Sequence, residues 1–352
     1  MTMNLGRVCL LAFIWSSTSA AGMDTVLVGH AANFGDVSTS SINPYNNAVT
    51  NGLNSAIARY TDELKAKGRQ IKVQNFDYGT KEILSLKVAK EMISSPVVAA
   101  IGFYESGQAL LAGPELEKAR LPLISPVASA TRLFSIGPHF HPMSFSNQDM
   151  GFASAHMATA ILKAKSALVV SAADCAYCSD LATSFEAKAR QLNMSVERVN
   201  ILNEDTAFPK VDRIISARKF DVVVVPNHEL TSAKVISHLM KAGVTVPFLG
   251  GDGWGNADGA GFFQIVNDPK FVGYCLGHWH PDLSNTLGKE FVNDWKAKYG
   301  QVPSTDSAMA YESMRLLILA ILKTEKPSRE NVQKALLSMR PYEGITGTFR
   351  FS

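Results

Sequence analysis

The chain has 352 residues, of which 46% are hydrophobic and 18% are charged. This is the composition of an ordinary globular protein, and the length suffices for two domains with sizeable cores. The 34 basic and 31 acidic residues are well mixed and leave a net charge of +3, with no basic stripe and no interleaving of aromatic and basic residues. A nucleic acid is therefore not an expected partner.

Residues 1–21 have the pattern of a secretory signal peptide. Arg7 supplies positive charge, residues 8–15 form a short apolar core, and residues 19–21 are small. We expect an exported protein that is cleaved after residue 20 or 21. Cys9 lies inside the apolar core rather than at its end, so a lipid attachment site is not expected there. No later apolar run reaches the ~18 residues of a membrane span.

The first half of the chain alternates strand and helix patterns. The predicted strands cover residues 25–29, 71–76, 97–101 and 123–125, and the predicted helices cover a long region ending at 65 and residues 81–93 and 108–119. Strands and helices in this order predict a doubly wound parallel sheet.

Two consecutive strand-to-helix turns in this half carry small hydroxyl residues. Ser106 stands at the start of the helix predicted at 108–119, and Ser129 follows Ala128 in the turn after Pro126. Neighbouring parallel strands would bring both serines to one edge of a sheet, where ligands of open α/β folds bind. Free backbone N–H groups at helix starts also attract anions such as a carboxylate. Each serine taken alone can equally serve as a helix cap.

A second series of the same type follows an extended, proline-bounded segment at residues 137–143. Its predicted helices cover residues 151–163, 181–192, 212–218 and 232–242, and its strands cover 167–171, 196–201, 221–226 and 247–250. Another extended segment at 271–281 precedes two helices at 285–299 and 307–324. We therefore expect a second parallel sheet.

The loop at residues 250–255 places one carboxylate, Asp252, and one large aromatic residue, Trp254, among four glycines after a strand. Such a loop allows close approach of the backbone to a ligand. An aspartate between glycines is also a common turn residue.

The cysteines of the expected mature chain are Cys175, Cys178 and Cys275. The C-x-x-C spacing marks redox sites or half of a zinc site in other proteins. A zinc site would need a second ligand pair nearby, and the thioredoxin pattern is absent. We expect a Cys175–Cys178 disulfide that stiffens its loop and leaves Cys275 as a free thiol.

Two H-x-H segments place His139 with His141 and His278 with His280. Paired imidazoles on one face of a strand could hold a metal or titrate near pH 6.5. Solvated or backbone-bonded histidines are the alternative that we favour, so neither a metal nor a cofactor is predicted.

Residues 99–133 carry a specific resemblance. Their strand, S-x-x, helix and PLISP-V-A-S order resembles, almost position by position, the core of the periplasmic leucine/isoleucine/valine-binding proteins, which are type I substrate-binding proteins of ABC importers. The similarity extends at lower density from about Thr25 to the C-terminus. It implies an α/β fold of two doubly wound parallel-sheet lobes joined by a multi-strand hinge.

The resemblance also implies domain limits. The first lobe would comprise residues 22–141 and 278–345, the second lobe 142–277 and 346–352, with hinge crossings near 137–143, 271–281 and 346–351. Family members continue for several tens of residues past the last of these strands, so we expect the final element of the second lobe to be missing, trimmed or replaced.

In this family an amino acid is held at both charged ends between the lobes. By position, Ser106 and Ser129 would receive the carboxylate, Asp252 would receive the ammonium group, and Ala128 would be a further ligand-binding residue. Tyr177 and His228 match aromatic pocket positions, although the imidazole replaces an aromatic hydroxyl. Further pocket residues would be Trp254 and Phe34. Phe34 could also pack under its own turn, and His228 could bond the backbone of its turn.

Together with the resemblance, these features predict a monomeric solute-binding protein of the periplasm. It would capture a small polar ligand such as an amino acid and deliver it to an ABC permease. Enzyme signatures such as G-x-S-x-G, a P-loop or H-E-x-x-H are absent, and no catalysis is expected. A periplasmic sensor of the same fold is the first alternative. A hydrolase or thiol redox protein that uses Cys175 and Cys178 is the second.

Overall fold

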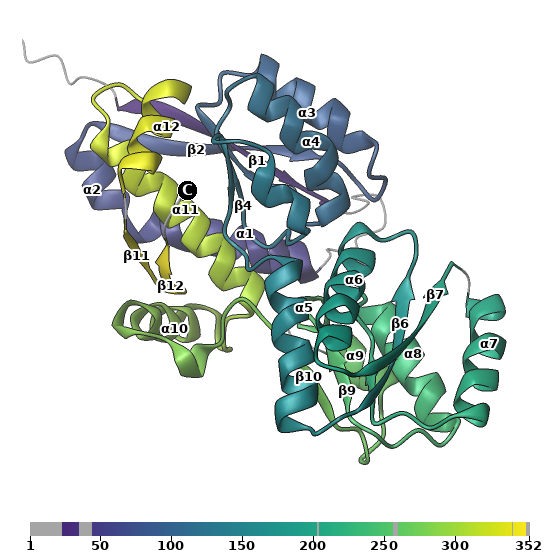
Figure 1. Cartoon of the computed structure of the whole chain (residues 1–352). Coiled ribbons are helices and arrows are strands. Elements are labelled where there is room, and N and C mark those ends of the chain that lie inside the picture. The colour runs from purple at the N-terminus through teal and green to yellow at the C-terminus, as the bar shows by residue number, and fades with distance from the viewer. Residues whose placement is uncertain (1–22, 35–43, 203, 256–259, 340, 350–352) are drawn as a thin grey trace, which may run out of the picture.

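The computed structural model describes residues 23–34, 44–202, 204–255, 260–339 and 341–349. They form two α/β lobes, each built around a five-stranded parallel sheet (Figure 1). The two doubly wound parallel sheets predicted from the sequence are therefore confirmed. The predicted signal peptide lies outside the described residues. Among the described helices, none combines the length and the apolarity that a membrane crossing requires.

The first sheet has the strand order β2-β1-β3-β4-β5. Its strands are β1 (Asp24–Ala32), β2 (Arg69–Asp77), β3 (Ala99–Gly102), β4 (Leu123–Ser125) and β5 (Phe140–Pro142). The register places Val28 opposite both Val73 and Ala99, which makes β1 an interior strand. Such a strand is covered on both faces, and its run of small and branched apolar residues follows from that position.

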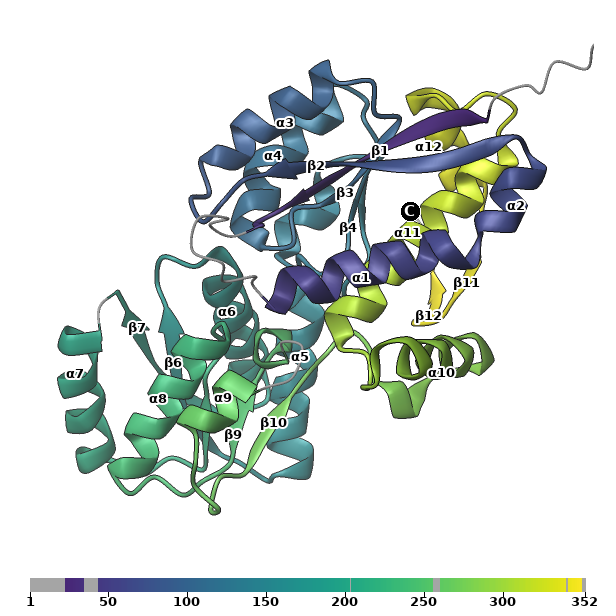
Figure 2. The same ribbon diagram turned by 180° about the vertical axis from the view of Figure 1, so that it is seen from behind.

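The helices of the first lobe come from both ends of the chain. They are α1 (Pro44–Arg59), α2 (Thr61–Ala66), α3 (Leu84–Ser94), α4 (Ser106–Lys118), α10 (Thr286–Tyr299), α11 (Thr305–Lys323) and α12 (Arg329–Ser338). The long helix α11 is buried over most of its length and runs alongside α1 (Figure 2). A Cβ atom at Gly52 of α1 would lie 2.5 Å from the carbonyl oxygen of Ser307, so only glycine allows this close approach.

The second sheet has the strand order β10-β9-β8-β6-β7. Its strands are β6 (Ser166–Ala172), β7 (Ser195–Ile201), β8 (Val222–Val224), β9 (Phe248–Gly250) and β10 (Gly273–Cys275). Its helices are α5 (Asn147–His156) with a π-helical extension (Met157–Ile161), α6 (Ala176–Gln191), α7 (Glu204–Ala217), α8 (Glu229–Lys241) and α9 (Ala260–Ile265). Both sheets thus show the same alternation of strand and helix.

The chain passes between the lobes at two described places. It leaves the first sheet after β5 and enters α5, and it returns after β10, since Trp279 packs in the core of the first lobe. The carbonyl oxygen of Trp279 accepts a hydrogen bond of 3.1 Å from the Thr305 hydroxyl at the start of α11. The chain thus runs from the first lobe to the second between β5 and α5, and back again between β10 and Trp279.

The segment expected to form a third crossing is arranged differently. The strands β11 (Tyr342–Gly344) and β12 (Gly347–Phe349) form an antiparallel hairpin, and Phe349 packs against the core of the first lobe. The turn uses a positive φ at Gly347, and the buried carboxylate of Glu312 on α11 accepts the backbone N–H of Ile345. These contacts hold residues 342–349 on the first lobe rather than the second; residues 350–352 lie outside the described residues.

Candidate ligand-binding site

Loops that follow the strands of the two sheets meet where the lobes adjoin. Thr131, at the start of a 3-10 turn (Thr131–Ser135) in the first lobe, donates its backbone N–H and its hydroxyl to Asp180 of α6 at 2.7 and 2.9 Å. The carbonyl oxygen of Ser129 accepts the backbone N–H of Asn147 on α5 at 2.7 Å. The turn after β4 is therefore tied directly to two helices of the second lobe.

Ser106 joins the two hydroxyl-bearing turns of the first lobe. It is the first residue of α4 and is 3% exposed. Its hydroxyl oxygen accepts the backbone N–H groups of Ser129 at 3.3 Å and Ala130 at 3.1 Å. Because a hydroxyl has two acceptor sites and one proton, the proton of Ser106 is the group left to donate. The hydroxyl of Ser129 forms no hydrogen bond within the described part of the chain.

An acidic side chain already lies on the first turn of α4. A Cβ atom at Gly107 would overlap the carboxylate of Glu82, so this carboxylate packs directly on the helix start. A negative charge is favourable there because helix N-termini carry partial positive charge. A ligand carboxylate near this turn would therefore depend on the hydroxyl groups of Ser106 and Ser129 more than on free N–H groups.

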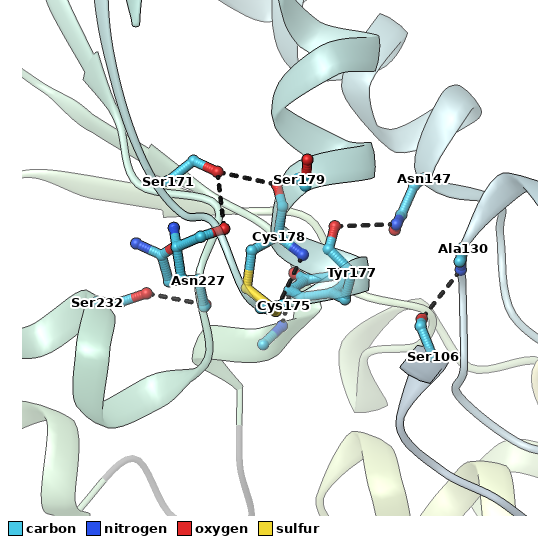
Figure 3. Close-up of a disulfide and its surroundings, with 12 residues drawn as sticks. Ser106, Ala130, Asn147, Ser171, Cys175, Tyr177, Cys178, Ser179, Asn227 and Ser232 are labelled. Carbon is cyan, nitrogen blue, oxygen red and sulfur yellow. Dashed lines mark hydrogen bonds between the residues drawn. A yellow bond between two sulfur atoms is a disulfide. The ribbon is translucent and has the colours of Figure 1, made fainter. Parts of the chain in front are cut away.

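The disulfide loop of the second lobe presents Tyr177. Cys175 and Cys178 are joined by a disulfide with an S–S distance of 2.03 Å, and Cys175 is the N-cap of α6 (Figure 3). Tyr177 lies between them in sequence and is 4% exposed. Its carbonyl oxygen accepts the side-chain amide N–H of Asn147 at 3.1 Å, and its hydroxyl accepts the backbone N–H of Gly253 at 3.1 Å.

The tyrosine hydroxyl explains part of the glycine pattern at residues 250–255. A Cβ atom at Gly251 would overlap the Tyr177 hydroxyl, and one at Gly253 would lie 3.0 Å from the Tyr177 ring. Burial and the nearby charge of Asp252 raise the pKa of Tyr177 well above its ordinary value, so the hydroxyl keeps its proton. The loop after β9 is thus shaped around this ring.

Asp252 opens a 3-10 turn (Asp252–Trp254), and its carboxylate is paired on one side only. Its Oδ2 lies 3.2 Å from Nε2 of His278, while its buried Oδ1 has no hydrogen-bond partner among the described residues. His278 is fixed in turn, since its Nδ1 accepts the backbone N–H of Phe145 at 3.2 Å. Burial opposes ionisation of Asp252, but His278 and the Tyr177 hydroxyl beside it lower its pKa below the ordinary value.

A second acidic residue faces this position from the first lobe. Asp306, in the first turn of α11, is 8% exposed. Burial and the charge of Asp252 raise the pKa of Asp306 from 3.8 to about 7. Among the described residues, Asn147 offers another acceptor, since it is fully buried and its side-chain Oδ1 has no hydrogen-bond partner. Acceptors for a positively charged or N–H-bearing group therefore gather at the junction.

The remaining pocket predictions have mixed placements. Trp254 is 6% exposed in the core of the second lobe, and its indole N–H donates to the carbonyl oxygen of Val225 at 2.9 Å. This packing accounts for Trp254 without a ligand. Ala128 is also buried, and its carbonyl oxygen accepts the Ser144 hydroxyl at 2.8 Å.

Phe34 and His228 lie nearer the surface. Phe34 is partly buried and meets the ring of His30 edge-on at a centroid distance of 5.3 Å. His228 is exposed, precedes α8 and lies 5.1 Å from the ring centroid of Tyr177. His228 is thus next to a proposed pocket residue, whereas Phe34 packs on its own strand.

The four histidines of the H-x-H segments have separate partners. Besides the His278–Asp252 contact, the partners are Glu117 for His139, Gln333 for His141 and Asp282 for His280. Cys275 is a free, exposed thiol. The four histidines of the H-x-H segments therefore have four different local environments, and His278 is the one that pairs with Asp252.

Three of the residues at this junction were not identified from the sequence as ligand residues: Asn147, His278 and Asp306. Asp306 follows Ser304, whose hydroxyl caps α11, so its sequence signal is that of an acidic residue favouring a helix start. Asn147 likewise sits at the start of α5, after the capping residue Ser146. A helix-cap pattern explains both residues locally, and only the tertiary structure brings them to the junction.

Comparisons with known proteins bear on this arrangement. Residues 34–352 match the profile of a family described as periplasmic binding protein. No curated protein matched the sequence. Among solved structures, the leucine-binding protein LivK of Thermotoga maritima has a TM-score of 0.81 at 22% identity, over 92% of this chain and 91% of that chain.

Two other structures are similarly close. The branched-chain amino acid transporter substrate-binding protein LivJ of Streptococcus pneumoniae, in complex with isoleucine, has a TM-score of 0.82 at 23% identity, over 94% and 92% of the two chains. A solute-binding protein of an ABC transporter from R. palustris, in complex with benzoate, has a TM-score of 0.77 at 20% identity, over 94% and 89%. At these identities the likeness establishes a shared fold.

Proposed function

The chain belongs to the periplasmic binding protein family, and from this we propose that it is an extracytoplasmic solute-binding protein that captures an amino acid between its lobes. A bound ligand would then be delivered to an ABC permease. The observation that carries the amino-acid assignment is the buried, unpaired Oδ1 of Asp252. An ionised carboxylate oxygen at such a position calls for a charged donor, and a ligand ammonium group supplies one.

Further acceptors support the ammonium end. Asn147 contributes a second buried oxygen without a partner among the described residues. Asp306 contributes a carboxyl group whose pKa is raised to about 7 by burial and by the charge of Asp252. A positive charge placed between these residues would relieve the repulsion between the two carboxyl groups. The site therefore favours a ligand with an amino group over an aliphatic or aromatic acid that lacks one.

The carboxylate end would lie on the first lobe. The Ser106 proton and the Ser129 hydroxyl are donors at the turn that contacts Asn147 of the second lobe. Hydrogen bonds to charged groups contribute roughly 1.5–3 kcal/mol each, so three or four of them suffice for micromolar binding, which is ~8 kcal/mol, after binding costs. No chemical step is needed for this function.

A ligand that contacts both lobes selects the arrangement in which the lobes are close, because only that arrangement satisfies both of its ends. The structural neighbours bind leucine, isoleucine or benzoate, so the fold itself leaves the ligand side chain open. The imidazole of His228 lies beside Tyr177, and its presence at this end of the proposed pocket would favour a ligand side chain with some polarity. We propose a monomeric protein of the periplasm, exported by its N-terminal segment.

Ligand screening tests this proposal. The purified protein is melted with each of the common L-amino acids and, in parallel, with 4-methylvalerate and benzoate, which keep the carboxylate but lack the amino group. A ligand at 100 times its Kd stabilises the folded state by about 2.7 kcal/mol. We expect stabilisation by at least one amino acid and none by the acids without an amino group. Stabilisation by those acids alone would overturn the assignment.

Asp252 is then tested with the amino acid that binds. Asp252→Asn should weaken its binding at least tenfold in calorimetry, because the ammonium group loses its charged acceptor. Asp282→Asn is the matched control, since the Asp282 side chain is 88% exposed and its loss should leave the affinity unchanged. Equal affinity of the Asp252→Asn variant and the wild type would remove Asp252 from the site.

A further inference from the structure

The C-x-x-C loop has a third potential ligand that the sequence does not indicate. Sγ of Cys175, Sγ of Cys178 and a ring nitrogen of His228 all lie within 4.8 Å of one another. The histidine comes from the loop after β8, some fifty residues further along the chain. If the disulfide is reduced, two thiols and an imidazole from two separate loops form the donor set of a structural or open zinc site.

The surroundings suit thiolate ligands. Cys175 is the N-cap of α6, and the backbone N–H of Cys178 donates to its sulfur at 3.1 Å. His228 is the N-cap of α8, so two helix N-termini converge on the three side chains. Their partial positive charge stabilises the negative charge of a thiolate. A zinc ion with two thiolates is neutral overall, and its charge is therefore balanced inside the site.

The three side chains are also accessible and held in place. Cys178 is buried, Cys175 is partly buried and His228 is exposed, so an ion has a path from solvent along the histidine. Asn227, fully buried beside His228, accepts the backbone N–H of Ala172 at 2.7 Å and donates to the carbonyl oxygen of Val170 at 2.9 Å. These two hydrogen bonds fix the loop of His228 to the strand that leads into the cysteine loop.

We propose that Cys175, Cys178 and His228 bind one zinc ion when the two cysteines are reduced, and that zinc and the disulfide exclude each other. A thiol reductant converts the disulfide to two thiols in a two-electron step and is itself oxidised to a disulfide. Zinc(II) then replaces the two thiol protons, which are released, and takes the imidazole nitrogen as its third ligand.

The geometry needs little rearrangement. Two sulfur atoms bound to one zinc ion at ~2.3 Å each, at a tetrahedral angle, lie ~3.8 Å apart. The Cα atoms of Cys175 and Cys178 are 5.2 Å apart, so side-chain rotation alone can separate the sulfurs to that distance once the disulfide is open. Three protein ligands leave the fourth position of the ion for water.

Zinc binding to the purified full chain tests the proposal. The protein is reduced, freed of reductant under anaerobic conditions, and titrated with zinc(II) against a chromophoric chelator; the disulfide form is titrated in parallel. We expect one zinc ion per reduced chain and at least a hundredfold weaker binding to the disulfide form. Cobalt(II) in place of zinc should give a thiolate-to-cobalt charge-transfer absorption in the reduced protein only.

Substitutions assign the ligands. His228→Ala should weaken zinc binding of the reduced protein at least tenfold, whereas His156→Ala, which removes an exposed histidine at the end of α5, should not change it. Circular dichroism and thermal melting establish that each variant is folded, and His228→Gln serves as a second variant if the alanine protein does not fold. Equal zinc affinity of the reduced wild type and a folded His228 variant would overturn the proposal. So would equal affinity of the reduced and disulfide forms.

Discussion

Replacing Asp306 by asparagine should change how the stability of the ligand-free protein depends on pH. Asp306 is 8% exposed, and burial together with the charge of Asp252 raises its pKa from 3.8 in its ordinary state to about 7 in the folded protein. The folded state therefore binds this proton more tightly than the unfolded chain does. The protonated Asp306 side chain therefore contributes to the stability of the folded state. This contribution is fully present below about pH 4 and is lost as the pH rises through about 7.

The size of the effect follows from the two pKa values. A difference of one pKa unit is worth about 1.36 kcal/mol, so ionisation of Asp306 should lower the free energy of unfolding by at most about 4 kcal/mol between pH 4 and pH 8. Asparagine has nearly the same shape and carries no charge. The Asp306→Asn variant should therefore gain stability relative to the wild type as the pH rises over this range.

Urea unfolding of both proteins at several pH values measures this difference. Subtracting the two curves cancels the groups that titrate equally in both proteins, so the remaining pH dependence reports on Asp306. The exposed Asp282→Asn variant should give a difference that does not vary with pH. If the difference between wild type and Asp306→Asn is also flat from pH 4 to pH 8, the reasoning from burial and the charge of Asp252 is refuted.

Two further substitutions, one of them with a control, probe the contacts that hold the hairpin on the first lobe and the two lobes against each other. Glu312→Ala removes the carboxylate that accepts the buried Tyr342 hydroxyl and pairs with the guanidinium of Arg315. This change should lower the free energy of unfolding, measured in urea, by about 3–5 kcal/mol. The control Glu330→Ala, which removes one partner of an exposed ion pair, should lower the free energy of unfolding by under about 1 kcal/mol. Equal losses in the Glu312 and Glu330 variants would contradict a stabilising role of the buried network around Glu312. Asp180→Ala removes the carboxylate that accepts both hydrogen bonds of Thr131 between the lobes. We expect a larger radius of gyration in small-angle scattering and faster ligand dissociation. Unchanged values would show that this contact does not hold the lobes together.

The fold was largely predictable because its signals are local and repeated. Alternating apolar strands and helical segments indicated both parallel sheets, and the strand Leu123–Ser125 coincides with its predicted bounds. The helices α9 and α12 were not predicted; they have only 6 and 10 residues, too few for a clear period. The hairpin of β11 and β12 was not predicted, because the Glu312 carboxylate that accepts the N–H groups of its turn is far away in sequence.

The candidate site was less predictable, for a related reason. Motif resemblance selected Asp252 and Tyr177, which the structure places side by side. The contribution of Asp306 arises only when α11 brings it near Asp252, and that of His228 to the disulfide loop arises only when two loops of the second sheet converge. Sequence patterns report what a residue does for its own helix or turn. They do not report which charge it will meet from another element.

Tyr177 connects the two proposals physically. It lies between the two cysteines, its hydroxyl accepts the N–H of Gly253 next to Asp252, and its ring contacts His228. An ion bound by Cys175, Cys178 and His228 would therefore lie next to the tyrosine of the ligand site. Linkage makes any such coupling reciprocal: if zinc changes the affinity for the amino acid by some factor, the amino acid must change the affinity for zinc by the same factor. Gly251 and Gly253 pack closely against this tyrosine, so any shift of its ring on zinc binding would reach the loop that carries Asp252.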